Sequence, residues 1–257
     1  MILIDTHTHL FVDAFDDDRT EMLERARQEG VSHFLLPNID LGSIERLKTM
    51  VASENDCFGM MGLHPCSVTA DYKESLKAIR KELIEGNYLA VGEIGIDLYW
   101  DKTFLAEQKE AMKIQCEWAK ELKLPIVIHA RDSFAEIFEV IDSVNDDNLT
   151  GVFHCFTGGA QEAQKILSYG GFKMGLGGVL TFKKSGLDQV VKQFDLENFV
   201  LETDSPYLAP TPYRGKRNES AYVKLVAQKL ADTFEVTFDE VARTTSASAK
   251  ELFKLGD

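Results

Sequence analysis

The feature of this sequence that most constrains its fold is an alternation of short apolar runs with longer amphipathic stretches, repeated from one end to the other. The stretches between the runs are long enough to form helices, so the chain repeats a strand–helix unit. The apolar runs occupy residues 2–6, 33–37, 58–63, 89–94, 125–129, 151–153, 172–175 and 199–202. Eight such units in 257 residues predict an α/β fold, a single (β/α)8 TIM barrel, which usually takes about 250 residues.

An open, doubly wound sheet is the alternative arrangement of such units. That fold usually carries a glycine-rich phosphate turn after its first strand. The segment that follows the first run here, Thr6-His-Thr-His-Leu10, contains no glycine. The sequence therefore favours the closed barrel.

Helical periodicity and capping residues predict where helices lie. Apolar residues recur at helical spacing over residues 104–122. Three aspartates at 16–18 supply carboxylates to cap a helix over 19–29, and Gly30 is a natural stop for it. Ser133 and Glu136 have the spacing of a capping box.

The chain continues beyond the eighth predicted strand. Residues 220–231 have the pattern of the eighth helix, and residues 237–254 predict a C-terminal helical extension that packs back on the barrel. Residues 1–257 are therefore expected to form one domain.

The composition narrows the setting in which the protein works. The four cysteines include no C-x-x-C pair, and the N-terminal apolar run is too short for a signal peptide. No stretch approaches the ~20 apolar residues of a membrane span. We therefore expect a cytoplasmic monomer with reduced thiols, no membrane contact and no evident protein partner. The net charge of −14 argues against tight, non-specific binding of duplex DNA, but it allows an anion to bind locally at a metal centre.

Six possible metal ligands fall at the carboxyl ends of predicted strands, where α/β barrels carry their reactive groups. His7 and His9 are two residues apart, so both imidazoles point to the same face of the first strand. Glu93 lies in an otherwise apolar strand, where an unpaired carboxylate would be costly to bury, so a metal or another cation is its expected partner. The six predicted ligands are His7, His9, Glu93, His129, His154 and Asp204.

Each of these residues also has a plainer interpretation when it is taken alone. His129 and His154 fit the pattern of buried histidines bonded to backbone carbonyls. Asp204 could cap the turn that begins at Ser205, and the His7-Thr-His9 pair could be two independently hydrogen-bonded histidines. The shared position at strand ends favours metal ligation over these alternatives.

Several short segments follow one another along the chain in a distinctive order. They are Asp5-Thr-His-Thr-His9, Gly62-Leu-His-Pro65, Val91-Gly-Glu-Ile-Gly-Ile-Asp97, residues 125–131, His154-Cys-Phe-Thr-Gly158 and Glu202-Thr-Asp-Ser-Pro206. Together they resemble the TatD-type metal-dependent deoxyribonucleases of the amidohydrolase superfamily. The resemblance covers nearly the whole chain and implies a deoxyribonuclease with two divalent metal ions. It places His7, His9 and Asp204 on one ion and His129 and His154 on the other, with Glu93 bridging.

The ligand set suggests how such a centre would act. Two divalent ions, whether zinc, magnesium or manganese, would activate a water for attack on a phosphodiester. Glu93 and Asp204 are the expected catalytic residues, with Asp204 as the base that accepts the proton of the water. Two ions, two carboxylates, one hydroxide and neutral imidazoles carry about +1 in total, which moderately favours an anionic substrate. The expected substrate contacts are Arg131, His64, Glu202 and Arg214.

Aromatic residues in two segments have more than one interpretation. Arg214 lies within residues 207–217, where aromatic and basic residues interleave. This segment predicts either a rim that stacks bases of single-stranded nucleic acid or a rigid proline loop with solvated charges. Tyr99 and Trp100 follow the fourth strand and either line the mouth of the barrel or pack in its core.

Three functions are compatible with the sequence. The first is a deoxyribonuclease that trims single-stranded DNA or DNA ends, because a recessed barrel mouth suits a chain end better than intact duplex. The second is a hydrolase of small esters, lactones or amides on the same metal centre. The third is a barrel that binds metal without turnover.

Overall fold

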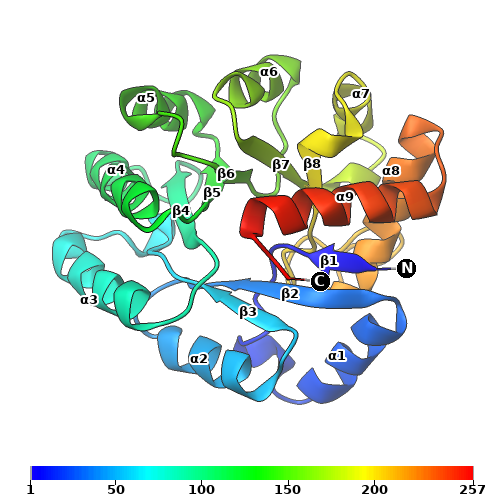
Figure 1. Cartoon of the computed structure of the whole chain (residues 1–257), viewed down its shortest axis with the longest axis horizontal. Helices are drawn as coiled ribbons and strands as arrows, with labels where there is room; N and C mark the ends of the chain where they lie inside the picture. Colours follow the sequence, from blue (N-terminus) through cyan, green and yellow to red (C-terminus); the bar gives the residue numbers. More distant parts are fainter. Residues whose placement is uncertain (1, 257) are drawn as a thin grey trace.

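The computed structural model describes residues 2–256, in which parallel strands alternate with helices. The strands are β1 (Leu3–Asp5), β2 (Val31–Pro37), β3 (Cys57–Met60), β4 (Val91–Asp97), β5 (Ile126–Arg131), β6 (Gly151–Phe153), β7 (Phe172–Leu176) and β8 (Phe199–Leu201). The helices are α1 (Arg19–Gln28), α2 (Ile44–Ser53), α3 (Tyr72–Glu85), α4 (Leu105–Leu122), α5 (Phe134–Val144), α6 (Ala160–Ser168), α7 (Leu187–Val191), α8 (Val223–Phe234) and α9 (Phe238–Phe253). Figure 1 shows the strands at the centre of the molecule and the helices around them.

The strands close into a barrel, as the sequence predicts. Strands β1 to β3 form one parallel sheet and strands β4 to β8 form another. Hydrogen bonds just beyond the strand ends join the two sheets at both seams. The amide of Thr6 donates to the carbonyl of Leu201 at 3.0 Å, and the amide of Met61 donates to the carbonyl of Ala90 at 3.1 Å. An open sheet would leave these edge groups unpaired, so the doubly wound alternative is wrong.

Side-chain alternation along the strands separates an apolar floor from a polar mouth. Val127, Val152 and Val200 belong to the cluster inside the barrel, whereas their chain neighbours pack outward against the helices. Two residues after each of these valines, the inward-facing positions are occupied by His129, His154 and Glu202. The same two-residue period therefore places apolar side chains in the core and, nearer the strand ends, polar side chains at the mouth of the barrel.

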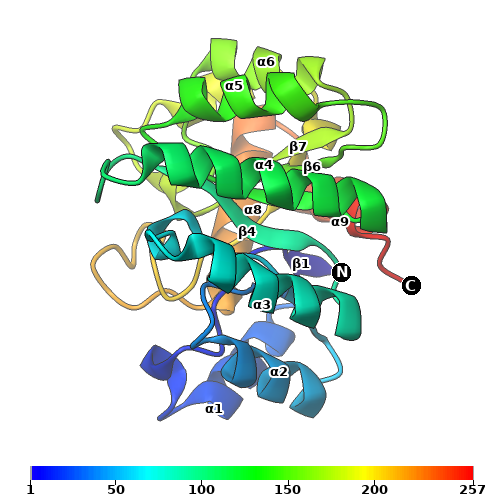
Figure 2. The same cartoon turned by 90° about the vertical axis from the view of Figure 1, so that its left-hand side faces the viewer.

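Helix α9 closes the opposite end of the barrel. Its Ala249, Leu252 and Phe253 pack on the apolar floor beside Ile4 and Leu35. Figure 2 shows α9 on the right, while the loops ahead of α4 and α8 project on the left. The prediction that the C-terminal segment packs back on the barrel is therefore confirmed, with Thr237 capping the helix through its hydroxyl, which accepts from the amide of Glu240 at 3.2 Å.

Two predicted helix caps are wrong, because the side chains have better partners. Ser133 makes no cap, since its hydroxyl donates to the carbonyl of Ile96 at 2.6 Å. The carboxylate of Asp18 likewise caps nothing and instead binds the guanidinium groups of Arg25 and Arg217. The bonds of Asp18 to the two guanidinium groups carry charge on both partners, whereas a bond to a helix-cap amide would carry charge on the carboxylate alone.

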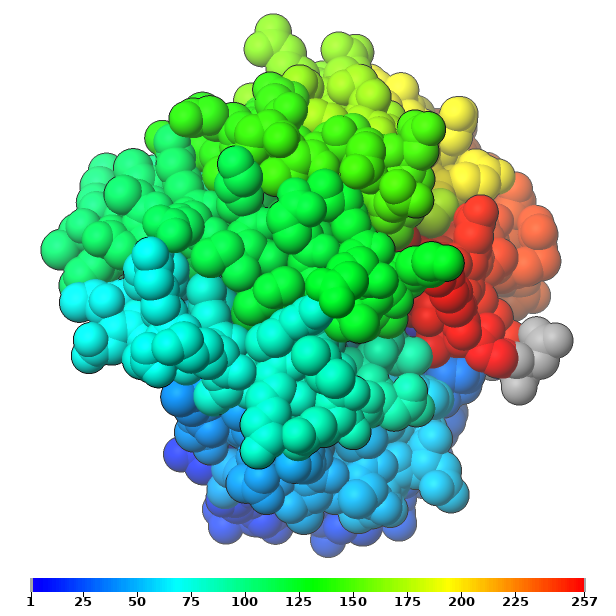
Figure 3. All heavy atoms as spheres, turned by 60° about the vertical axis from the view of Figure 1, so that its left-hand side comes forward, coloured from blue at the N-terminus to red at the C-terminus, as the bar shows by residue number. Residues whose placement is uncertain are grey.

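The outer surface follows the order of the chain. Figure 3 shows residues running from blue through cyan to green, as expected for helices that each lie beside the next, with red residues of α9 beside green ones. There the ammonium of Lys254 donates to the carbonyl of Lys123 at 2.8 Å. Among residues 2–256, no helix is both long enough and apolar enough to span a membrane.

Replacing Phe253 with alanine tests the role of α9 as the barrel floor. The side chain is 1% exposed, so Phe253→Ala should lower the free energy of unfolding by about 3–5 kcal/mol through lost burial and a cavity. Urea denaturation followed by circular dichroism measures the change. Ile84, which is 59% exposed on α3, provides the control, and Ile84→Ala should change stability by no more than about 0.5 kcal/mol. Equal stabilities for the two variants would contradict this role for α9.

Candidate metal centre

The predicted ligands meet in one cavity at the carboxyl ends of the strands. The cavity has a volume of about 740 Å³. His7 is fully buried beneath the cavity. His129 and Asp204 are the most accessible of the six predicted ligands, with 15% and 13% of their side chains exposed. The polar residues that line the cavity are His9, His64, Cys66, Glu93, Asp97, His129, Arg131, His154, Cys155, Thr157 and Asp204.

The carboxylate of Glu93 lies at the centre of this cluster. Its Oε1 is 2.9 Å from Nε2 of His154 and 2.8 Å from Nδ1 of His129, and its Oε2 is 3.1 Å from Nε2 of His7. His64 also approaches Oε1, with Nε2 at 3.4 Å. Glu93 is therefore in a position to connect ligands that come from β1, β5 and β6.

Asp204 lies against the two histidines of the first strand. Its Oδ1 is 3.5 Å from Nε2 of His9 and 3.8 Å from Nε2 of His7. The three residues form one group whose donor atoms all lie within 4.8 Å of one another, and a second such group consists of His64, Glu93 and His129. A third group joins His7 and His154 to Glu202. The first group matches the ligand set predicted for one of the two ions.

A clamp between the first and last strands fixes Asp204 beside His7. The amide of Asp204 donates to the carbonyl of His7 at 2.9 Å. Below it, the buried carboxylate of Asp5 accepts hydrogen bonds from the amide of Thr203 at 2.9 Å and from its hydroxyl at 2.6 Å. Burial raises the pKa of Asp5 to about 7 despite these bonds.

The donor set fits divalent metal ions. Both ring nitrogens of His7, Nδ1 of His9, Nδ1 of His154 and Oε2 of Glu202 are buried without an aligned hydrogen-bond partner among the described residues. Buried polar atoms without partners are rare in folded proteins, because each costs free energy. Imidazole nitrogens with carboxylate oxygens are the usual ligands of zinc and other transition ions, and carboxylates also suit magnesium and manganese. These residues could therefore hold metal ions.

Two carboxylates that face the ligands from behind complete the cluster. Oδ2 of Asp97 is 2.9 Å from Nε2 of His129, and Oε1 of Glu202 is 3.4 Å from Nδ1 of His154. Carboxylates in such positions orient a histidine and raise its basicity. The site prediction did not include Asp97. The two-residue period was the available signal, because Asp97 lies four residues after Glu93 on the same strand and so faces the same side.

Mutual attraction sets the ionisation of the cluster. Burial alone would raise the pKa of Glu93, but the nearby His154, His64 and His7 hold it well below its usual range. Burial likewise opposes the charged form of His154, yet Glu93 and Glu202 raise its pKa well above the usual value. Divalent ions at these ligands would stand in for the positive charge that the histidines supply here.

The predicted substrate contacts fall in different places. His64 and Arg131 line the cavity. The side chain of Glu202 is fully buried behind His154, where it accepts a hydrogen bond from the amide of Cys155. The guanidinium of Arg214 lies 4.0 Å above the ring of Phe182, on a loop outside the cavity lining. Only two of the four residues are thus brought to the open part of the cavity.

The charge balance differs from the expectation based on the ligands alone. Asp97 and Glu202 add two negative charges beside the histidines. With two divalent ions and a hydroxide, the total falls from about +1 to about −1, and Arg131 brings it back to about neutral. Attraction of an anion therefore depends more on Arg131 than the sequence suggests.

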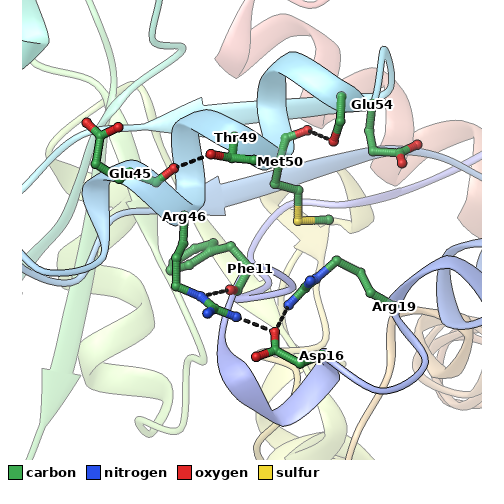
Figure 4. Close-up of a pocket in the computed structure, with 9 residues that line it drawn as sticks. Phe11, Asp16, Arg19, Glu45, Arg46, Thr49, Met50 and Glu54 are labelled. Carbon is green, nitrogen blue, oxygen red and sulfur yellow. Dashed lines mark hydrogen bonds and ion pairs between the residues drawn. The ribbon is translucent and has the colours of Figure 1, made fainter.

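A second hollow, between α1 and α2, has a volume of about 350 Å³. Three of its charged side chains, Arg19, Arg46 and Asp16, bind one another, as Figure 4 shows. Arg19 and Arg46 both reach Asp16, and Nε of Arg46 donates to the carbonyl of Phe11 at 2.7 Å. These bonds hold the loop that follows His9, so we interpret this hollow as structural.

Replacing Gly175 with alanine tests the role of Glu202 behind the ligands. A Cβ at position 175 would lie 2.2 Å from Oε2 of Glu202, so Gly175→Ala should displace that carboxylate from His154. We expect metal affinity to fall about 10–100-fold, measured by competition with a chromophoric chelator. Gly177→Ala is the matched control, because its Cβ would meet Glu202 only at an ordinary 3.7 Å. Unchanged metal affinity in the folded Gly175→Ala protein would refute this role.

Comparisons with known proteins identify the family of this chain. The sequence model of the family described as TatD related DNase matches residues 4–254. The chain is 36% identical over 255 residues to the uncharacterized metal-dependent hydrolase YabD of Bacillus subtilis (strain 168), covering 99% of this chain and 100% of that protein. It is 32% identical over 246 residues to the 3'-5' ssDNA/RNA exonuclease TatD of Cronobacter sakazakii, covering 93% of each chain.

A solved structure has the same fold. The crystal structure of YjjV, a TatD homologue from Escherichia coli K12, superposes with a TM-score of 0.93 at 27% identity. The superposition covers 99% of this chain and 98% of that one. The chain belongs to the TatD-related DNase family and is a metal-dependent hydrolase of the TIM-barrel fold.

Proposed function

We propose that this protein is an exonuclease that hydrolyses phosphodiester bonds at the ends of single-stranded DNA. The observation that carries the proposal is the position of a metal-ligand cluster at the bottom of a recessed cavity, with the cationic side chain of Arg131 among its lining residues. The name of the Cronobacter relative, a 3'-5' ssDNA/RNA exonuclease, supports the same class of substrate.

The residues present would hold two divalent ions. In this proposal His7, His9 and Asp204 would hold one ion, His129 and His154 would hold the other, and Glu93 would be a ligand shared by both. The group of His7, His9 and Asp204 supports the first half of this division. Ions bound there supply Lewis acidity, which lowers the pKa of water and neutralises charge that develops on a phosphodiester.

The side chains have distinct tasks in this reaction. The carboxylate of Asp204 accepts the proton of the attacking water. It is the more accessible of the two proposed catalytic carboxylates, because 13% of the Asp204 side chain is exposed and only 2% of the Glu93 side chain. Arg131 binds a phosphate oxygen, and His64 donates a hydrogen bond to the substrate. Arg214 contacts the strand farther out, on the rim. Glu202 acts on the substrate only through His154.

The shape and charge of the protein favour chain ends over duplex. The ligands lie at the bottom of the cavity, where a flexible single strand or a terminus reaches more easily than the continuous backbone of a duplex. The net charge of −14 disfavours non-specific binding of long nucleic acid. As a part of the same proposal, the protein acts as a cytoplasmic monomer of one domain.

Two other functions are compatible with the same residues. A hydrolase of small esters, lactones or amides would use the same ligands, and the near-neutral local charge leaves room for it. A barrel that binds metal without turnover is the remaining possibility. Both are distinguished from a nuclease by a direct assay.

Incubation with a 5'-labelled and a 3'-labelled single-stranded oligonucleotide tests the proposal. Together with zinc, magnesium or manganese, the enzyme should remove terminal nucleotides, and a chelator should abolish the reaction, because the ligand cluster requires the ions. A panel of small esters, lactones and amides runs in parallel. Turnover of that panel alone would favour the second function, and full metal occupancy without any turnover would favour the third.

An Asp204→Asn variant tests the assignment of the base. It removes the proton acceptor while preserving size, so kcat on the oligonucleotide should fall about 10²–10⁴-fold. Metal content must be measured in the same preparation, so that lost ions are not mistaken for lost proton transfer. Asp239→Asn, an exposed change on α9 at the far end of the barrel, should leave kcat unaltered. Near wild-type turnover by Asp204→Asn with its metals bound would rule out this role.

A further inference from the structure

The exposed aromatic side chains of this protein are concentrated at the mouth of the metal cavity. Among residues 2–256, the aromatic side chains classed as exposed are Trp100, Tyr99 and Tyr207, at 70%, 55% and 52%. Trp100 and Tyr207 line the metal cavity, and Tyr99 lines a groove beside it. Scattered exposed apolar residues are ordinary, but a cluster around a binding cavity marks a contact surface. We refer to Tyr99, Trp100 and Arg131 as the aromatic ledge.

The ledge is attached to the metal centre. Oδ1 of Asp97 accepts hydrogen bonds from the amides of Tyr99 at 2.9 Å and Trp100 at 3.1 Å. The other oxygen of the same carboxylate is 2.9 Å from Nε2 of His129. One side chain therefore holds both a predicted metal ligand and the backbone of the ledge. Because the backbone at Trp100 is already held, less conformational freedom is lost when a ligand covers this side chain.

Arg131 completes the ledge and leaves one ring open. Its guanidinium carbon lies 3.9 Å from the centroid of the Tyr99 ring and 5.5 Å from that of Trp100. The two rings meet edge to face, with centroids 4.9 Å apart at an angle of 88°. Arg131 thus covers Tyr99, whereas most of the Trp100 side chain remains exposed to solvent.

The adjoining groove has room for a chain but few features of an anion site. Its volume is about 580 Å³, and it shares Arg131, Ala130 and Thr157 with the metal cavity. Asp132 and Glu162 also line it, so a second phosphate would be repelled there. Stacking of a base is the interaction that an exposed indole next to a guanidinium favours.

We propose that Trp100, held by Tyr99 and Arg131, stacks a base that flanks the scissile phosphate and thereby selects single strands. This inference rests on the proposed function, because it takes the substrate to be a nucleic acid. An unpaired base offers a free face to the indole, whereas a base inside a duplex is already stacked on both sides. The ledge therefore discriminates between strands without reading their sequence.

Tryptophan fluorescence tests binding independently of turnover. The chain has two tryptophans, and the second, Trp118, lies on α4 under the guanidinium of Arg80. A Trp118→Phe variant of the metal-loaded enzyme leaves Trp100 as the sole emitter. A phosphorothioate oligothymidylate, chosen to resist hydrolysis, should quench its emission with saturation, and a duplex of the same length should bind at least about tenfold more weakly. Binding of the oligonucleotide, seen by anisotropy, without quenching would overturn the proposal, and so would an absence of binding.

Kinetics then separate the ledge from the metal chemistry. Trp100→Ala should raise KM for a single-stranded oligonucleotide about 5- to 100-fold, with a smaller fall in kcat, and Trp100→Phe should restore most of the affinity. Ile84→Ala, an exposed apolar change on α3, should leave both constants at wild-type values. A KM for Trp100→Ala within twofold of wild type would overturn the ledge. If wild-type enzyme binds and quenches but hydrolyses no oligonucleotide, the ledge stands and the proposed function fails.

Discussion

Glu93 is 98% shielded from water, and five histidines surround its carboxylate: His7, His9, His64, His129 and His154, at 3.1, 3.7, 3.4, 2.8 and 2.9 Å. A carboxylate in that position is strongly unfavourable unless positive charge stays close to it. These histidines come from four separate parts of the chain, so the strands that lead to them must hold their places. The geometry of the mouth follows from this single buried charge.

The rest of the barrel keeps those strands in register. The apolar floor, built from residues such as Val127 and Val152, places His129 and His154 two residues further along the same strands. The hydrogen bonds of Thr203 to the Asp5 carboxylate fix the position of the neighbouring residue, Asp204. Asp97 extends the arrangement outward, because one carboxylate connects His129 to the loop that carries Trp100. Core, ligands and rim are thus connected by short chains of contacts.

Much of this could be predicted from the sequence. The spacing of apolar runs predicts the barrel and the helix that follows it, because burial repeats with the period of each element. Histidines and carboxylates near the carboxyl ends of the strands predict that these side chains gather at the mouth of the barrel. What failed depended on partners distant in sequence. Ser133 and Asp18 have the pattern of helix caps, but Ile96 and Arg217 compete for them from 37 and 199 residues away, and no local pattern reveals those competitors. The burial of Glu202 was missed in the same way, because it depends on His154 in front of it. Asp97 was missed although the two-residue period of its strand offered a local signal.

The clamp between β1 and β8 also bears on how the protein is made. Asp5 and Thr203 are 198 residues apart, and they meet directly beneath His7 and Asp204. Contacts this distant in sequence form late and slow the folding of a domain. During synthesis, the first histidines emerge from the ribosome long before their carboxylate partner exists. The nascent chain therefore cannot assemble the cluster of His7, His9 and Asp204 until most of the protein has been translated, and an incomplete product released early would lack that cluster as well.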